Sequence, residues 1–201
     1  MTRAGRPPRS ASPARRRRRL ALATLALSSG LAIAAAEIAL RLGSDDEHGR
    51  LRVLTPVYHH GLRPGVVTEA AWGGDRIPYA IDSLGFRDAS PRDVPLVPDP
   101  GARRVLFLGD SFTEGVGVRY EDTFVSRFGL LTGREALDGG VVSHGPLLEW
   151  LRLRDLVARG FRADDVVVLF DPSDVQDEVV YHAMVRHDAS GEPTGFHSFR
   201  N

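Results

Sequence analysis

The feature that most limits how this chain can fold is an uncharged apolar run, Leu20 to Ala36, placed directly after five consecutive arginines. Its 17 residues lie at the short end of what crosses a bilayer as a helix. The helical pattern continues past this run as far as Leu42, and the first turn residue is Gly43. The sequence therefore predicts one N-terminal transmembrane helix, residues 20–42, and a globular fold has to be built from the residues after it.

The arginine block also predicts the topology of this helix. Arg15 to Arg19 keep the adjacent end on the cytoplasmic side, and residues 43–201 then lie outside the cytoplasm, in a periplasm or at the cell surface. A cleaved signal peptide is the alternative, because Ala34-Ala35-Ala36 has the small residues of a processing site. It would export the same residues. The unbroken helical pattern favours a signal anchor held in the membrane.

Charge is distributed unevenly along the chain. Residues 1–19 contain eight arginines, three prolines and no acidic residue, a composition that predicts a disordered basic tail. From Glu37 onward there are 18 basic and 26 acidic residues, a net charge of −8. This mildly acidic part argues against a nucleic-acid partner. Since the chain has no cysteine, it has neither disulfides nor thiolate metal sites.

Two regions come after the anchor. Residues 43–100 contain seven prolines among short apolar pieces and are predicted to be an irregular extracytoplasmic linker, with a turn at His59 to Pro64 and an extended piece at Ile77 to Arg87. Pro98, Pro100 and Gly101 mark the boundary with a more regular region, residues 101–201.

The regular region alternates strands and helices, a pattern typical of an α/β layer fold with parallel strands. Gly139-Gly140 is expected to end the middle strand, and the segment after Asp171 is predicted to be a surface loop. The expected strands are Val105 to Leu108, Glu135 to Leu137 and Val166 to Phe170, and the expected helices are Glu121 to Thr132 and Pro146 to Gly160.

Ser111 is the candidate nucleophile. It comes directly after a buried strand, so it lies at the carboxyl edge of the sheet, where open α/β folds place their ligand crevices. Gly115 and Gly117 leave backbone amides unobstructed nearby. The alternative is an ordinary strand-to-helix turn, in which Asp110 and Ser111 only satisfy backbone donors.

Other motifs are excluded. A phosphate-binding P-loop needs a lysine, and the chain has none. A dinucleotide fingerprint needs glycine where Tyr120 stands, and the nucleophile elbow of the larger α/β hydrolases needs glycine where Thr113 stands. Asp171, Asp174 and Asp177 lack calcium-loop spacing. No cofactor and no metal are predicted.

Three segments in the right order resemble the motif blocks of the SGNH (GDSL-type) hydrolases. They are Val105-Leu-Phe-Leu-Gly-Asp-Ser-Phe-Thr-Glu-Gly115, Leu137-Asp-Gly-Gly-Val-Val-Ser-His-Gly-Pro146 and Phe170-Asp-Pro-Ser-Asp174. The anchor and Ser83-Leu-Gly-Phe-Arg87 look like a membrane-anchored branch of that family. The resemblance implies a three-layer doubly wound, flavodoxin-like parallel sheet, of which residues 101–201 would be the incomplete N-terminal part.

The resemblance also implies site residues. Ser111 would attack an ester carbonyl, and the amides of Ser111 and Gly140 would hold the oxyanion. Ser173 stands at the degenerate third oxyanion position, where the family has an asparagine, and Asp138 also replaces a frequent asparagine. Loss of one oxyanion donor typically lowers turnover about 10²-fold to 10³-fold.

The family's general base is missing. It comes from an Asp-x-x-His motif near the C-terminus, which does not occur in this sequence. His182, His187 and His197 are expected to be exposed, and His144 to have a structural role. The resemblance then implies a truncated chain that is at best a very weak esterase alone.

The expected function is that of a membrane-anchored serine ester hydrolase acting on a small-molecule acyl ester or an O-acetylated carbohydrate. An O-acyltransferase acting on envelope polysaccharide and a non-catalytic envelope protein, such as an inactive SGNH-like binding module, remain as alternatives.

Overall fold

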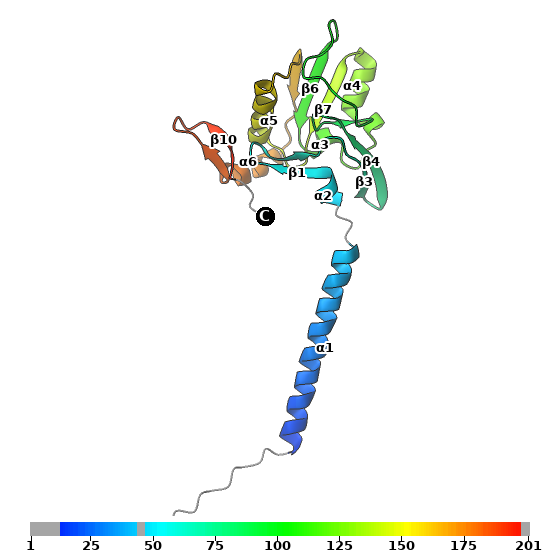
Figure 1. The fold of residues 1–201 in the computed structure, drawn as a ribbon, viewed down its shortest axis with the longest axis vertical. Coiled ribbons are helices and arrows are strands. Elements are labelled where there is room, and N and C mark those ends of the chain that lie inside the picture. Colours follow the sequence, from blue (N-terminus) through cyan, green and yellow to red (C-terminus); the bar gives the residue numbers. More distant parts are fainter. Residues whose placement is uncertain (1–12, 44–46, 198–201) are drawn as a thin grey trace, which may run out of the picture. The chain divides into compact units, whose positions relative to one another are not determined.

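The computed structural model describes residues 13–43 and 47–197, which form two compact units (Figure 1). The N-terminal unit is one helix, α1 (Pro13–Gly43). Its segment Arg17–Ile38 is long and apolar enough to cross a membrane, with a mean hydropathy of 1.7. The predicted helix 20–42 lies within α1 and ends at the predicted glycine. The prediction of a disordered tail is wrong for Pro13 to Arg19, which are helical, and residues 1–12 lie outside the described residues.

The second unit is a mixed α/β fold around a six-stranded sheet with the order β3-β4-β5-β7-β6-β8. Its strands β6, β7 and β8 are parallel, and the remaining three pair antiparallel. The sheet strands are β3 (Val67–Trp72), β4 (Asp75–Ile81), β5 (Arg87–Asp88), β6 (Arg104–Gly109), β7 (Glu135–Gly140) and β8 (Asp165–Val168). The purely parallel sheet expected from the sequence is therefore wrong, whereas its three parallel strands are confirmed.

Helices cover both faces of the parallel strands. Because side chains alternate along a strand, Val105 and Phe107 of β6 point to one face and pack against α4 (Phe124–Thr132). Leu106 and Leu108 point to the other face and pack near α5 (Pro146–Ala158). Both helices begin and end close to the predicted bounds. Gly133 ends α4 in the left-handed conformation that favours glycine.

Residues 47–100 are folded, and the prediction of an irregular linker here is wrong. A hairpin of β3 and β4 turns at Gly73-Gly74, both with positive φ, and joins the main sheet through β5. The turn expected at His59 to Pro64 begins instead with a strand. The extended piece expected at Ile77 to Arg87 contains the end of β4 and the start of β5. The further elements of this region are α2 (Glu47–Leu51), β1 (Arg52–Thr55) and β2 (His59–Leu62).

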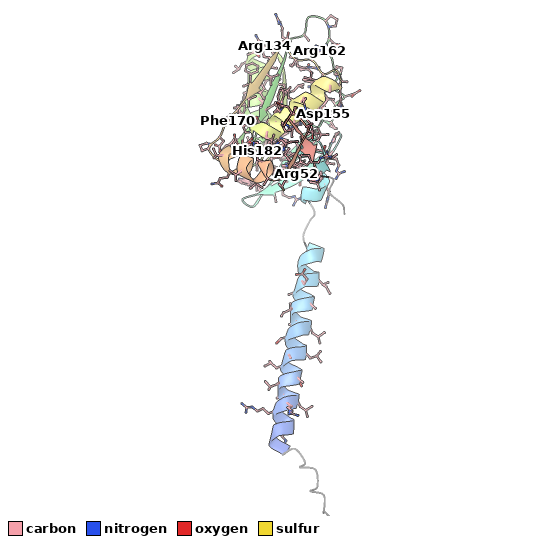
Figure 2. All side chains as sticks on the ribbon, turned by 90° about the vertical axis from the view of Figure 1, so that its left-hand side faces the viewer. Arg52, Arg134, Asp155, Arg162, Phe170 and His182 are labelled. Atoms are coloured by element: carbon pink, nitrogen blue, oxygen red, sulfur yellow. The ribbon has the colours of Figure 1, made fainter. Side chains whose placement is uncertain are left out.

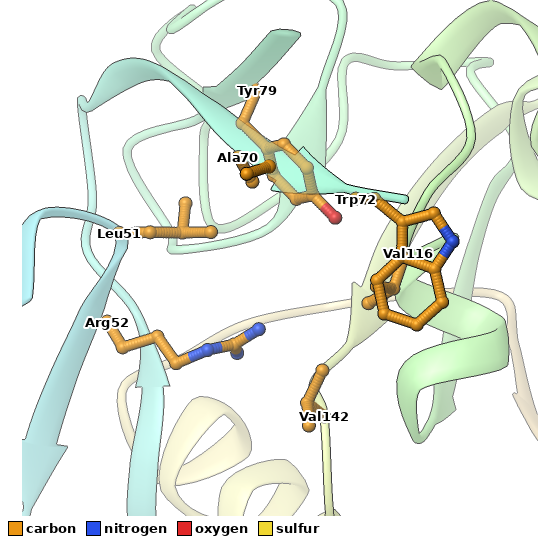
Figure 3. Close-up of a pocket in the computed structure, with 8 residues that line it drawn as sticks. Leu51, Arg52, Ala70, Trp72, Tyr79, Val116 and Val142 are labelled. Atoms are coloured by element: carbon orange, nitrogen blue, oxygen red, sulfur yellow. The ribbon is translucent and has the colours of Figure 1, made fainter. Parts of the chain in front are cut away.

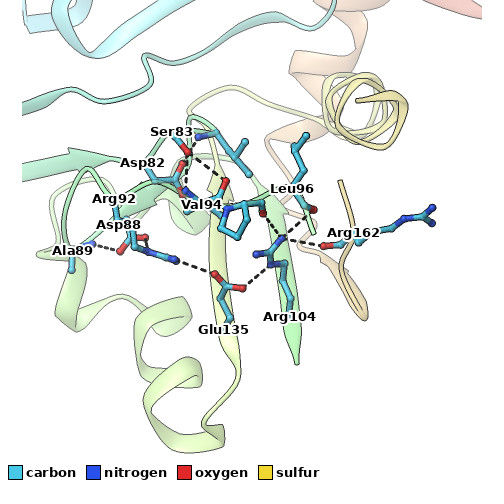
Figure 4. Close-up of polar contacts among 12 residues, drawn as sticks. Asp82, Ser83, Asp88, Ala89, Arg92, Val94, Leu96, Arg104, Glu135 and Arg162 are labelled. Carbon is cyan, nitrogen blue, oxygen red and sulfur yellow. Dashed lines mark hydrogen bonds and ion pairs between the residues drawn. The ribbon is translucent and has the colours of Figure 1, made fainter. Parts of the chain in front are cut away.

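Buried arginines fasten this region to the parallel strands. Arg104 lies wholly inside and donates to Glu135 Oε2 at 2.7 Å and to the carbonyl oxygen of Pro95 at 2.8 Å (Figure 4). Arg152 of α5 donates to the carbonyl oxygens of Gly139 and Gly85. A planar guanidinium can serve several carbonyls at once, which suits it to this role.

The strand β7 runs through both glycines that were expected to end it. A Cβ on Gly139 would lie 2.6 Å from the carbonyl oxygen of Phe107, and a Cβ on Gly140 would overlap the backbone nitrogen of Glu114. These glycines therefore permit close packing of backbones.

The edge strand β8 is poorly covered. Val166, Val167 and Val168 expose between 37% and 48% of their surface, and Phe170 exposes 72% (Figure 2). A bare apolar edge of this kind is rare in soluble proteins, which usually protect it with charge or cover.

The segment after β8 was expected to be a loop, but it contains regular structure. Its elements are α6 (Asp174–His182) and a hairpin of β9 (Val185–His187) and β10 (Pro193–Phe196). His182, His187 and His197 are exposed, which confirms that expectation.

Candidate functional site

Ser111 lies at the carboxyl end of β6, as its position after the strand predicted. It is the first residue of the short helix α3 (Ser111–Glu114), and Asp110 caps this helix by accepting from the Phe112 amide at 2.9 Å. The Ser111 side chain is half-buried. Within the described part of the chain, neither its hydroxyl nor its amide has a hydrogen-bond partner. Both groups are therefore available to a ligand.

Glu114 ties α3 to two distant segments. Its carboxylate is fully buried and accepts from Arg52 Nη2 at 2.9 Å and Nη1 at 3.1 Å. It also accepts from the Val142 amide at 2.8 Å. The helix that begins with Ser111 is thus held against β1 and against the segment after β7.

Arg87 holds the loop after α3. Its buried guanidinium donates to the carbonyl oxygens of Glu114, Gly115 and Val118, each at 2.6 Å. It also lies over the Tyr79 ring, with its central carbon 3.9 Å from the ring centroid. A single side chain from β5 therefore fixes the backbone that leads away from Ser111.

Gly140 contacts the same helix, but its amide is already occupied. The Gly140 N–H donates to Asp138 Oδ1 at 3.1 Å, so an oxyanion at Ser111 would have to compete with this carboxyl group. Burial raises the pKa of Asp138 to about 8. A protonated Asp138 is neutral.

Ser173, the third expected oxyanion residue, has its hydroxyl engaged elsewhere. It is exposed and donates to Asp171 Oδ1 at 2.6 Å. The structure records no contact between Ser173 and Ser111, so these two predicted site residues are not linked by hydrogen bonds.

Three histidines cluster on the other side of Val142. Since a carbonyl oxygen only accepts, His60 Nε2 donates to Val142 O at 2.8 Å and His144 Nε2 donates to His60 O at 2.8 Å. His59 Nδ1 lies 2.8 Å from His60 Nδ1, and since the hydrogen of His60 is on Nε2, His59 Nδ1 is the donor and His60 Nδ1 the acceptor. Burial lowers the pKa of His60 to about 4 and that of His144 well below its usual range. These contacts agree with a structural role for His144, and no histidine among the described residues hydrogen-bonds to Ser111.

A largely apolar cleft opens beside Ser111. One pocket of about 370 Å³ is lined by Ser111, Phe112, Trp72, Val116 and Val142, among others. A second pocket of about 240 Å³ shares Trp72, Val116 and Val142 with the first and extends to Leu51, Arg52 and Tyr79 (Figure 3). Because they share three lining residues, these two pockets are neighbours, and we call them together the Ser111 cleft.

Several carboxyl groups lie near one another on α5 and α6, among them Glu149, Asp174 and Glu178. Glu149 is almost fully buried, its two oxygens have no hydrogen-bond partner in the described residues, and burial raises its pKa to about 7. Within residues 13–43 and 47–197, no group of three or more His, Asp or Glu side chains is arranged to hold a metal ion.

No protein-family model matches this chain, and no curated protein matches it.

Sequence reasoning missed most residues that build the site around Ser111. Trp72 and Arg52 lie in the region predicted to be a linker, and their contribution depends on contacts across the fold. Glu114 lies in the segment Val105 to Gly115 and Arg87 in the segment Ser83 to Arg87, but neither segment indicated that these side chains hold the site together. The one signal in the sequence was a glutamate, Glu114, so close to an apolar strand, which could have prompted a search for a basic partner.

Proposed function

We propose that this chain is an exported, membrane-anchored serine ester hydrolase of the SGNH type, with Ser111 as the nucleophile. The observation that carries the proposal is a serine with an unpartnered hydroxyl and amide, among the described residues, at the carboxyl end of a central parallel strand beside an apolar cleft. Gly140 supports the assignment less than Ser111 does, because its amide already donates a hydrogen bond to Asp138 Oδ1 and is not free for an oxyanion.

The strand order is compatible with the flavodoxin-like part of the proposal. Along the chain, the three parallel strands are first β6, second β7 and third β8, and their order in the sheet is β7-β6-β8. A flavodoxin-like sheet begins with the same second-first-third order, with its ligand crevice between the first and third strands. The antiparallel hairpin on the other side is an addition to that pattern.

In the proposed reaction, Ser111 Oγ forms a bond to the ester carbonyl carbon, the alcohol leaves, and water then hydrolyses the acyl-serine. The Ser111 proton needs an acceptor. Since no described histidine bonds to Ser111, we expect this proton to pass through water to the oxygen of the leaving alcohol, and turnover to be slow. An O-acyltransferase would use the same serine with a sugar hydroxyl in place of water.

A fluorophosphonate, which labels reactive serines, tests the proposal. We expect slow labelling of the Ser111 peptide by mass spectrometry and none in Ser111→Ala. Ser173→Ala is the matched control, and its labelling should be unchanged because its hydroxyl donates to Asp171. Equal labelling of Ser111→Ala would assign the reaction to another serine.

Complete absence of labelling would favour the second candidate, a non-catalytic envelope binding module. The observation that favours it is the engagement of His59, His60 and His144 with one another and with the main chain.

The proposed location is tested separately. A reporter that is active only outside the cytoplasm, fused after Asn201, should be active, because the arginine block retains the N-terminus inside. The mass of the exported chain, full-length or shortened by the N-terminal segment, then distinguishes an anchor from a cleaved signal peptide.

A further inference from the structure

The walls of the cleft beside Ser111 are largely apolar. Val116 and Val142 line both of its parts, and the Trp72 indole forms a third wall (Figure 3). Gly117 has φ +79°, and a Cβ there would lie 2.5 Å from Trp72 Cδ1. The indole therefore packs directly on the Gly117 backbone, although 59% of its surface is exposed.

The charges in the cleft cancel each other. The Arg52 guanidinium points into the cleft, but Glu114 accepts hydrogen bonds from both of its terminal nitrogens. The third hydrogen bond to Glu114 comes from the Val142 amide. An anionic or cationic ligand would gain little here, because each charge already has its partner.

The two ends of the cleft differ in chemistry. One end has the free hydroxyl and amide of Ser111, and next to it Phe112 exposes 73% of its surface. The other end has Leu51, Ala70 and the Tyr79 hydroxyl, which has no hydrogen-bond partner among the residues the structure describes. An elongated, uncharged ligand with a polar carbonyl at one end fits this arrangement.

We propose that the cleft binds one linear acyl chain, with its ester carbonyl at Ser111 and its methyl end between Trp72, Ala70 and Leu51. This inference rests on the proposed function for the position of the carbonyl. It selects medium-chain acyl esters over acetyl esters as the substrate class. The acyl chain could belong to a soluble ester or to a membrane lipid.

The chain has only two tryptophans, which allows a test without added labels. In Trp150→Phe, Trp72 is the sole tryptophan, and its emission reports on the cleft wall. The full chain, held in lipid nanodiscs, is titrated with methyl octanoate and with methyl acetate. We expect a saturable blue shift of the Trp72 emission. The concentration that gives half of this shift should be at least about thirtyfold lower for methyl octanoate than for methyl acetate, because each buried methylene raises affinity roughly fourfold.

Two variants fill the cleft. Ala70→Phe and Val142→Phe should each abolish the octanoate response while the far-UV circular dichroism stays unchanged. If Ala70→Phe does not fold, Val142→Phe alone provides the test. Trp72→Phe, which leaves Trp150 on α5, is the control and should show no shift. An octanoate response that persists in the filled variants, or that never saturates, would overturn the proposal.

The source of the acyl chain is tested with nanodiscs of phospholipids brominated on their acyl chains, since bromine quenches indole on contact. Quenching of Trp72 that methyl octanoate relieves would identify membrane lipid as the source. A saturable octanoate shift without such quenching would identify a soluble ester. Quenching that octanoate does not relieve would count against the cleft as the binding site.

Repeating the titration in Ser111→Ala separates this inference from the proposed function. Acyl binding without fluorophosphonate labelling of Ser111 would retain the acyl site and reject the hydrolase. Labelling of Ser111 without acyl binding would retain the hydrolase and reject the acyl site.

Discussion

Glu114 and Arg52 are 62 residues apart in sequence, yet both carboxylate oxygens of Glu114 accept from the terminal nitrogens of Arg52, at 2.9 Å and 3.1 Å. This pair joins the start of β1 to the helix that begins with Ser111. Since Glu114 is fully buried, its charge depends on this partner and on the Val142 amide.

Removing either member of this pair should destabilise the fold. We expect Glu114→Gln and Arg52→Met each to lower the free energy of unfolding by about 2–4 kcal/mol, because each leaves a buried group without its partner. The double variant should lose less than the sum, with a coupling of about 1–3 kcal/mol in urea unfolding. The exposed pair Arg76 and Glu69 is the control, and its coupling should stay under about 1 kcal/mol. Strict additivity at Arg52 and Glu114 would contradict the pairing.

Asp138→Asn should make the fold more stable at alkaline pH. Burial raises the pKa of Asp138 to about 8, so between about pH 4 and pH 8 the folded state holds a proton that the unfolded state releases. Stability from this group is therefore complete at low pH and falls as pH rises through that window. Asparagine has no proton to lose. The difference between variant and wild type should grow from about pH 4 to about pH 8, by at most about 1.4 kcal/mol per pH unit.

Unfolding midpoints in urea, recorded at several pH values, check this expectation. Asp164→Asn is the control, since that exposed carboxylate accepts from Arg103 and its pKa is lowered by the Arg104 amide and Arg103. A constant difference between Asp138→Asn and wild type would show that Asp138 ionises normally in the fold.

His60→Gln should remove part of the sensitivity to acid. Burial lowers the pKa of His60 to about 4, so between pH 6.5 and pH 4 the unfolded state takes up a proton that the folded state resists. The stability contributed by neutral His60 is thus complete above pH 6.5 and is lost as pH falls toward 4. Glutamine can still donate to Val142 O but does not titrate. In thermal unfolding, the melting temperature of the wild type should fall more steeply than that of the variant as pH decreases. Parallel pH profiles of the two melting temperatures would exclude this role of His60.

Val167→Lys should reduce self-association. The bare edge of β8, with its partly exposed valines, is a surface that can pair with another strand. A lysine on this edge should lower the concentration-dependent cross-linking of the chain in detergent several-fold. Leu131→Lys, at an 87% exposed position on α4, is the control and should leave cross-linking unchanged. Equal effects of both substitutions would assign association to general surface hydrophobicity.

The sequence predicted elements whose cause is local. Val105 to Leu108 is a continuous apolar run, and its strand β6 is buried on both faces. Pro146 begins α5, and Gly133 ends α4 in a left-handed conformation. The position of Ser111 after the strand results from the same local pattern.

The sequence did not predict elements whose cause is distant. The pairing of β5 with β7 brings Arg87 opposite Asp138. These two residues are far apart in the sequence, and the spacing of apolar residues does not indicate which strands pair. Gly139 and Gly140 are read as strand breakers in isolation, whereas their lack of a side chain lets β7 lie against β6 and α3. The Ser111 cleft depends on Trp72 and Arg52, so its walls were missed for the same reason.

The contact between Gly140 and the backbone nitrogen of Glu114 has a consequence for comparing this chain with others. Every amino acid except glycine carries a Cβ, and at position 140 that atom would overlap the backbone of α3. A related chain with another residue at this position must have moved α3, and with it the serine that begins the helix. Residue 140 can therefore be read in any newly found homologue as a marker of whether its serine occupies the position that Ser111 has here.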